Sequence, residues 1–192
     1  MPTSIPGARR SILTCAALAL GPVALPAQGA RVSLADPAAY GAEVERAVTL
    51  VRRATAAYQN IDAAIADGFP RVVASCLANQ EAGGMGHHHT NRARMDASVE
   101  IEKPEILLYS YHPDGRYVLN GVEYIVPFSV WPRDSAPPRV MGRDLIPSEG
   151  LNLWYLHVWI WTPNASGLFS DWNPTVTCRP AGGGGLDLSS QR

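Results

Sequence analysis

The sequence predicts an α+β domain in which a long N-terminal helix packs on a mostly antiparallel sheet, with one disulfide. Three observations predict this class. An apolar stripe with helical spacing runs through residues 36–67. Short β-type segments separated by turns follow between residues 105 and 161. Two cysteines, Cys76 and Cys178, remain once the N-terminal segment is set aside, and an even pair in an exported chain indicates a disulfide.

The helix is predicted to begin at Asp36, which is a suitable N-cap, with Pro37 in the first turn. Gly68 and Pro70 end it, because glycine suits the position after a helix and proline prevents its continuation. The apolar stripe recurs at steps of three and four residues and consists of Val44, Val48, Val51, Ala54, Tyr58, Ile61 and Ile65. Such a stripe indicates packing on a sheet more than a surface for a partner.

The sheet is predicted from two stretches of the chain. Residues 105–127 read as a three-stranded meander, with an Asp-Gly turn after the first strand and a bend at Gly121. Residues 151–161, LNLWYLHVWIW, are apolar on both faces of a strand, which predicts a central strand covered on both sides. Residues 76–100 and 128–150 have the composition of loops, and the first holds the cluster GGMGHHHTN.

The two ends of the chain are predicted to lie outside the globular domain. Residues 1–29 have the parts of a signal peptide, with Arg9 and Arg10 before an apolar core that ends in small residues. The core is too short for a permanent membrane anchor, and the arginine pair also resembles a twin-arginine signal. Residues 30–180 form a single domain and residues 181–192 a disordered tail. The predicted location is the periplasm or the cell exterior.

The composition limits the classes of partner. The formal net charge is −1 and charged residues make up 17% of the chain, so no basic patch indicates a nucleic-acid partner. The mature chain has no predicted membrane span. GxSxG and a phosphate-binding glycine loop ahead of a helix are both missing. The predicted partner is a small molecule or a metal ion.

The candidate site residues are those with ligand chemistry outside the helix. They are Met85, His87, His88, His89, Glu123 and His157. Imidazole suits zinc, copper and iron; two histidines with a carboxylate suit iron, and a thioether favours copper(I). Three alternatives remain open. His157 is a hydrogen-bonded core residue with the triple histidine exposed, Glu123 and His157 form a metal-free acid–base pair, or tryptophans hold a sugar or apolar ligand. The tryptophans considered are Trp131, Trp161 and Trp172.

Several short motifs resemble those of a family of small exported bacterial proteins without an assigned activity. They are Gly84-Met85-Gly86 with His88 and Asn91, Tyr58 with Ala66-Asp67-Gly68, Lys103-Pro104-Glu105 with Leu107, Leu108 and Tyr109, Gly121-Val122-Glu123-Tyr124 with Pro127, Leu156-His157-Val158-Trp159, Pro163-Asn164 with Gly167 and Phe169, and Trp172-Asn173-Pro174 before Cys178. The resemblance covers residues 55–178. The chain departs from it at His87 and His89, where the family usually carries an apolar and an aromatic residue. The resemblance implies no reaction, but it directs attention to His88, Glu123 and His157.

We therefore predict an exported protein with a histidine-based transition-metal site, with copper or iron favoured. His88 and His157 are the predicted ligands, and Glu123 is either the third ligand or the carboxylate that orients a ring. Met85 joins them if the metal is copper. The Cys76–Cys178 disulfide is expected to bring the glycine–histidine segment close to the strand that carries His157. Whether the protein is an enzyme is left open by the sequence.

Overall fold

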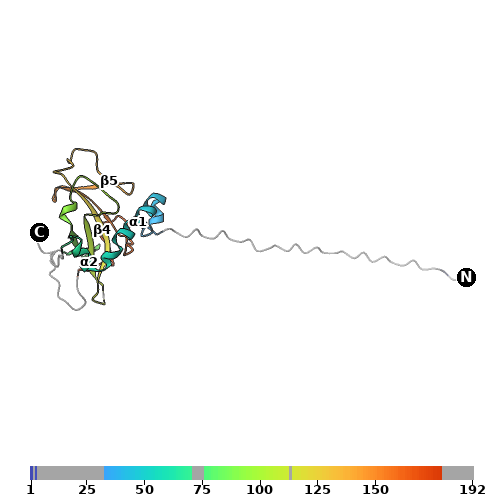
Figure 1. Cartoon of the computed structure of the whole chain (residues 1–192). Coiled ribbons are helices and arrows are strands. Elements are labelled where there is room, and N and C mark those ends of the chain that lie inside the picture. Colours follow the sequence, from blue (N-terminus) through green and yellow to red (C-terminus); the bar gives the residue numbers. More distant parts are fainter. Residues whose placement is uncertain (2, 4–32, 71–75, 113, 179–192) are drawn as a thin grey trace. The chain divides into compact units, whose positions relative to one another are not determined.

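Most of the predicted signal peptide and all of the predicted tail lie outside the residues that the structure describes. The computed structural model describes residues 1, 3, 33–70, 76–112 and 114–178. The residues described from 33 onward belong to one compact unit (Figure 1). Among the described residues, no helix has the length and apolar character needed to cross a membrane.

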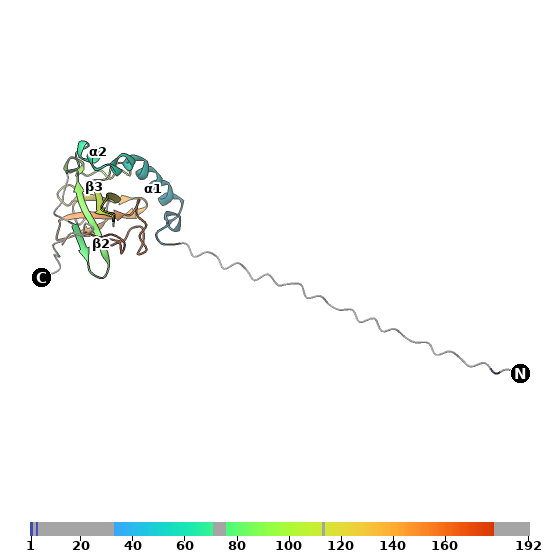
Figure 2. The ribbon, with the colours of Figure 1, turned by 90° about the horizontal axis from the view of Figure 1, so that it is seen from below.

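A six-stranded sheet is the main element of this unit. Its order is β1-β2-β3-β4-β8-β7, and every neighbouring pair is antiparallel. The strands are β1 (Cys76–Asn79), β2 (Gly83–Thr90), β3 (Ile106–Tyr111), β4 (Tyr117–Pro127), β7 (Ile146–Ser148) and β8 (Leu153–Val158). The sheet is curled rather than flat (Figure 2). A separate two-stranded pair, β5 (Arg139–Val140) and β6 (Arg143–Asp144), lies in the predicted loop between β4 and β8.

The predicted α+β class with one long helix over 36–67 is wrong. The stretch holds four short elements, namely the 3-10 turns η1 (Pro37–Tyr40) and η2 (Ala56–Gln59) and the helices α1 (Ala42–Thr55) and α2 (Ile61–Ala66). Asp36 and Pro37 cap only η1, because Gly41 has a φ of 95° and stops the turn. Asn60 is extended, and its side chain accepts a bond from the Asp62 amide, which starts α2 afresh. The domain is thus mainly a β-sheet with one helix of several turns.

The sheet has a helix face and an opposite face. Helices α1 and α2 run along the helix face (Figure 2). Four small apolar residues of α1 are buried against it. They pack in one cluster with buried residues from the strands, chiefly Leu107, Tyr109, Val122, Tyr124, Trp154, Leu156 and Val158. The opposite face carries a smaller cluster of Ile106, Leu108 and Ile125 with Met95, Leu153 and Tyr155 at its edge. Because side chains alternate along a strand, each remaining strand residue belongs to one of these two faces.

Several segments depart from the predicted strand pattern. Five strands, β1, β2, β5, β6 and β7, lie in the stretches 76–100 and 128–150 that were predicted as loops. The GGMGHHHT run is strand β2, not a loop. Residues 117–127 form the single strand β4, so the meander has two strands instead of three. Gly121 does not break that strand; a Cβ there would lie 2.5 Å from the Val158 carbonyl oxygen, so glycine permits a close approach of the chain that follows β8. Strand β8 keeps the predicted division between Tyr155 and His157 on one face and Trp154 and Leu156 on the other.

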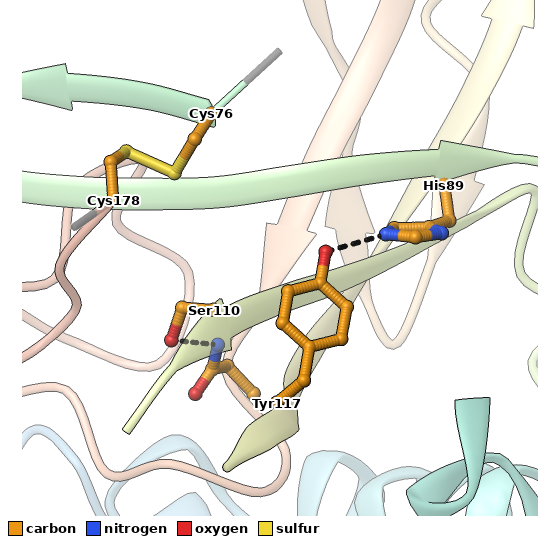
Figure 3. Close-up of a disulfide and its surroundings, with 6 residues drawn as sticks. Cys76, His89, Ser110, Tyr117 and Cys178 are labelled. Carbon is orange, nitrogen blue, oxygen red and sulfur yellow. Dashed lines mark hydrogen bonds between the residues drawn. A yellow bond between two sulfur atoms is a disulfide. The ribbon is translucent and has the colours of Figure 1, made fainter. Parts of the chain in front are cut away.

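The predicted disulfide is confirmed. Cys76 and Cys178 are joined with a Cα–Cα distance of 5.4 Å across a sequence separation of 102 residues (Figure 3). The bridge ties the edge strand β1 to the last described residue of the chain.

Candidate metal centre

Three strands bring one ionisable residue each to the face of the sheet opposite the helices. Glu123 of β4 pairs directly with His157 of β8. His88 of β2 pairs with Leu108 of β3, which is part of the apolar cluster on that face. Residues directly opposite in an antiparallel pair point to the same side, so the three side chains share this face. The arrangement depends on long-range strand pairing and on no local motif.

The three side chains form a compact group of ligand atoms. The Nε2 atoms of His88 and His157 are 3.4 Å apart. Glu123 Oε2 lies 3.5 Å from His88 Nε2, and Glu123 Oε1 lies 3.7 Å from His157 Nε2. An ion about 2.1 Å from each ligand atom at tetrahedral angles requires separations of roughly 3.4 Å. The His88–Glu123–His157 group could therefore hold a metal ion with little rearrangement.

Burial shapes the electrostatics of the group. The side chains of His88, Glu123 and His157 are 16%, 8% and 3% exposed. Burial, and then the neighbouring His157, lower the pKa of His88 to about 3, so its ring is neutral with a lone pair available. Burial also raises the pKa of Glu123, against the opposing effect of His157. Burial lowers the pKa of His157, but Glu123 and Asp171 outweigh it and the net shift is upward.

Asp171 belongs to this site and was not predicted. Its Oδ1 lies 3.3 Å from His157 Nδ1, and its Oδ2 accepts a hydrogen bond of 3.1 Å from the Tyr155 hydroxyl. The contact with His157 is a close charge pair without the alignment of a hydrogen bond, and the part of the chain that the structure describes offers Nδ1 no hydrogen-bond partner. That contact lowers the pKa of Asp171, so a carboxylate stands behind the ring. No pattern near Asp171 in the sequence signals this contact, because the residue reaches His157 from a segment outside the strands.

The neighbours of His88 on β2 lie on the helix face. His89 is fully buried, and its Nδ1 donates to the Pro70 carbonyl at 2.8 Å. Its Nε2 accepts from the Tyr117 hydroxyl, also at 2.8 Å (Figure 3). His87 packs against the Tyr111 and Tyr117 rings, and within the described residues neither of its ring nitrogens has a hydrogen-bond partner. The three histidines were predicted on a flexible loop; strand alternation instead separates His88 from the other two.

Two other predicted features are placed as follows. Met85 is half-buried on β2, three positions before His88, and its role as a copper ligand stays a prediction. Two of the three tryptophans considered as a ligand surface use their ring nitrogens within the fold. Trp131 Nε1 donates to the Ala136 carbonyl at 2.8 Å, and Trp161 Nε1 donates to Thr55 Oγ1 at 3.2 Å. Both rings also pack against the core on the helix face.

Comparisons with protein-family models, with curated proteins and with solved structures find no match to this chain. The resemblance to the exported bacterial family therefore stays a prediction from its motifs. The site has to be interpreted from its own geometry.

Proposed function

We propose that this chain is an exported protein that binds one transition-metal ion through His88, Glu123 and His157. The observation that carries the proposal is the convergence of these donors from β2, β4 and β8 within 4.8 Å of one another. The three donors are far apart in the sequence and mostly buried. A buried carboxylate such as Glu123 requires a partner, and a cation between the three donors would provide one. The disulfide supports an oxidising compartment.

Iron is our first candidate for the ion and copper the second. Two imidazoles and one carboxylate are the donor set of non-haem iron(II) sites, in which the remaining positions stay open to small molecules. Copper gains support from the same imidazoles, and a thioether such as that of Met85 would favour copper(I). Three protein ligands leave room for a water or small-molecule ligand on the side where His88 is partly exposed. Such an ion would polarise or activate that ligand.

A second candidate is a metal-free acid–base pair. His157 lies between the carboxylates of Glu123 and Asp171, which together raise its pKa above the ordinary value despite burial. An imidazole held in this way can take and return a proton. Activity that persists after treatment with a chelator would favour this candidate over the metal site.

The test is the metal content of the mature protein, purified from the periplasm without an affinity tag. We expect close to one ion per chain in the wild type, and its loss in His88→Ala and in His157→Ala. His112→Ala is the matched control, since His112 is exposed in a turn beside Asp114. Circular dichroism and thermal melting of each variant show that the fold is kept. A wild type that holds no metal and takes up no iron(II), copper or zinc would refute the proposal.

A further inference from the structure

The segment of residues 171–178, which we name the C-terminal strap, crosses β2 at its glycine-rich end. The Gly84 amide donates to the Asn173 carbonyl at 3.1 Å, and the Asn173 amide donates back to the Gly84 carbonyl at 3.0 Å. A Cβ at Gly83 would lie 2.1 Å from the Asn173 carbonyl oxygen, and one at Gly84 would lie 2.8 Å from that of Val176. The strap can take this path only because both positions are glycine.

Buried asparagine side chains fix the strap further. Asn173 is fully buried; its Nδ2 donates to the Pro163 carbonyl, and its Oδ1 accepts from the Thr175 amide and hydroxyl. Asn164 is also fully buried and donates to the Trp172 carbonyl at 2.9 Å. The disulfide at Cys178 holds the far end. These contacts account for the Gly-Gly and Trp-Asn-Pro motifs, which the three proposed metal ligands leave unexplained.

The fixed strap places one carboxylate against the site. Asp171 lies two residues before the Gly84–Asn173 contact and faces His157 Nδ1 at 3.3 Å. The Tyr155 hydroxyl donates to its other oxygen. His157 Nδ1 is buried, and the described residues give it no hydrogen-bond partner. Asp171 Oδ1, 3.3 Å away, is therefore the carboxylate within reach of the Nδ1 proton.

We propose that Asp171 is the positioning residue of the metal centre, and that the strap exists to hold it there. This inference rests on the proposed metal site. A carboxylate at Nδ1 keeps the proton on that nitrogen, so that the Nε2 lone pair faces His88 and Glu123 and is available to an ion. It also fixes the ring plane and makes the imidazole a stronger donor. Asp171 itself does not touch the ion.

The test measures the affinity of the full mature chain for copper(II), chosen because it binds nitrogen and oxygen sites most tightly among the divalent ions. Competition with a chelator gives the affinity, and electron paramagnetic resonance reports the ligand set. We expect Asp171→Asn to bind roughly 10- to 100-fold more weakly, as loss of such outer partners does, with an altered spectrum. Asp171→Glu restores part of the affinity, because it keeps the carboxylate. Asp134→Asn, at an exposed loop position, is the control and leaves both readouts unchanged.

Tyr155→Phe provides a second variant if Asp171→Asn melts below the assay temperature. It removes the hydroxyl that holds Asp171, and we expect copper(II) binding to weaken roughly tenfold, the value of one hydrogen bond to a charged group. Wild-type affinity and spectrum in both folded variants would overturn the role of Asp171 while leaving the three-ligand site intact. Absence of copper(II) binding by the wild type would overturn both the site and this inference. A lower melting temperature alone, with an unchanged spectrum, would also refute it, because that is the effect of a merely structural residue.

Discussion

His88 and His89 are adjacent on β2, yet they occupy opposite faces of the sheet and have unrelated roles. On the helix face, His89 has both nitrogens hydrogen-bonded and is fully buried, so it acts as a core residue. On the other face, His88 points its Nε2 at a second imidazole and a carboxylate, an arrangement that gains from a cation. The difference shows that strand face, and not residue type or clustering in the sequence, determines which histidine belongs to the site.

The register of the strands therefore determines which histidines face the site. His88 shares a face with Glu123 and His157 because β2 pairs with β3 so that His88 lies opposite Leu108. A shift of one residue would send His87 and His89 to the site and His88 to the core. The disulfide, the core histidine and the buried carboxyls each contribute to holding this arrangement, and each can be tested.

Removing the disulfide should have the largest effect on stability. The bridge closes a loop of 102 residues, for which the chain-entropy model gives roughly 4–5 kcal/mol. We expect the Cys76→Ser/Cys178→Ser double variant to lose about this much free energy of unfolding, measured by urea denaturation at neutral pH. Reductant should lower the wild-type midpoint towards that of the variant and leave the variant itself unchanged. Equal midpoints for the two proteins would contradict the prediction.

Exchanging each histidine for alanine should separate stability from metal binding. His89→Ala removes the partner of the Pro70 carbonyl and one partner of the Tyr117 hydroxyl, and it leaves a cavity, so we expect a cost of about 3 kcal/mol. His88→Ala, whose side chain is partly exposed, should cost less than about 1 kcal/mol without metal. Thermal and urea unfolding of the metal-free proteins would measure both.

The same pair of variants should show the reverse order in metal content. His88→Ala loses a proposed ligand, while His89→Ala keeps all three of them. A destabilised His88→Ala together with a metal-free but stable His89→Ala would show that the two faces have been assigned the wrong way round.

Two buried carboxyls, Glu123 and Glu105, extend the comparison. Glu123 has two imidazoles beside it, whereas Glu105 accepts a hydrogen bond from the Ile125 amide, just beyond the last β3–β4 pair. Burial raises the pKa of Glu105 to about 8, from 4.5. Because the folded-state pKa is the higher one, the neutral carboxyl stabilises the fold fully below pH 4.5. That stabilisation is lost as the pH rises through 8.

Glu105→Gln should remove this dependence, since glutamine stays neutral and its carbonyl can accept the same bond. Between pH 4 and pH 9 we expect the wild type to lose roughly 4–5 kcal/mol of unfolding free energy relative to the variant, the value of a pKa that rises from 4.5 to about 8. Urea midpoints measured across that range would show it. Parallel pH profiles for the two proteins would refute the shift assigned to Glu105.

Some parts of the fold could be predicted from the sequence and others could not. The disulfide followed from the even cysteine pair, and the faces of β8 followed from alternation at Tyr155 and His157, both of which depend on simple counting. The long helix was wrong because apolar periodicity continues through Gly41 and Asn60, whose backbone conformations interrupt it. Periodicity records which residues are buried and not whether the backbone between them is continuous.

The three ligand residues of the candidate site could be predicted from the sequence, but the strand that carries His88 and the fourth residue, Asp171, could not. His88, Glu123 and His157 stood out as ionisable residues in apolar or glycine-rich surroundings. Strand β2 was missed because three of its first four residues are glycine, which is depleted in strands. Asp171 was missed because it reaches the site only through the path of the strap over Gly83 and Gly84. Such a contact across the fold leaves no periodic signal near the residue that makes it.

His87 offers the smallest and sharpest test of the two faces. It is 3% exposed on the helix face and packs on two tyrosine rings, and neither nitrogen has a hydrogen-bond partner among the residues that the structure describes. An unpartnered buried polar group costs free energy that an apolar ring of similar shape avoids. We expect His87→Phe to be neutral or to gain about 1 kcal/mol in urea denaturation, with metal content unchanged. Loss of the metal in this variant would place His87 at the site face and overturn the register on which the comparison depends.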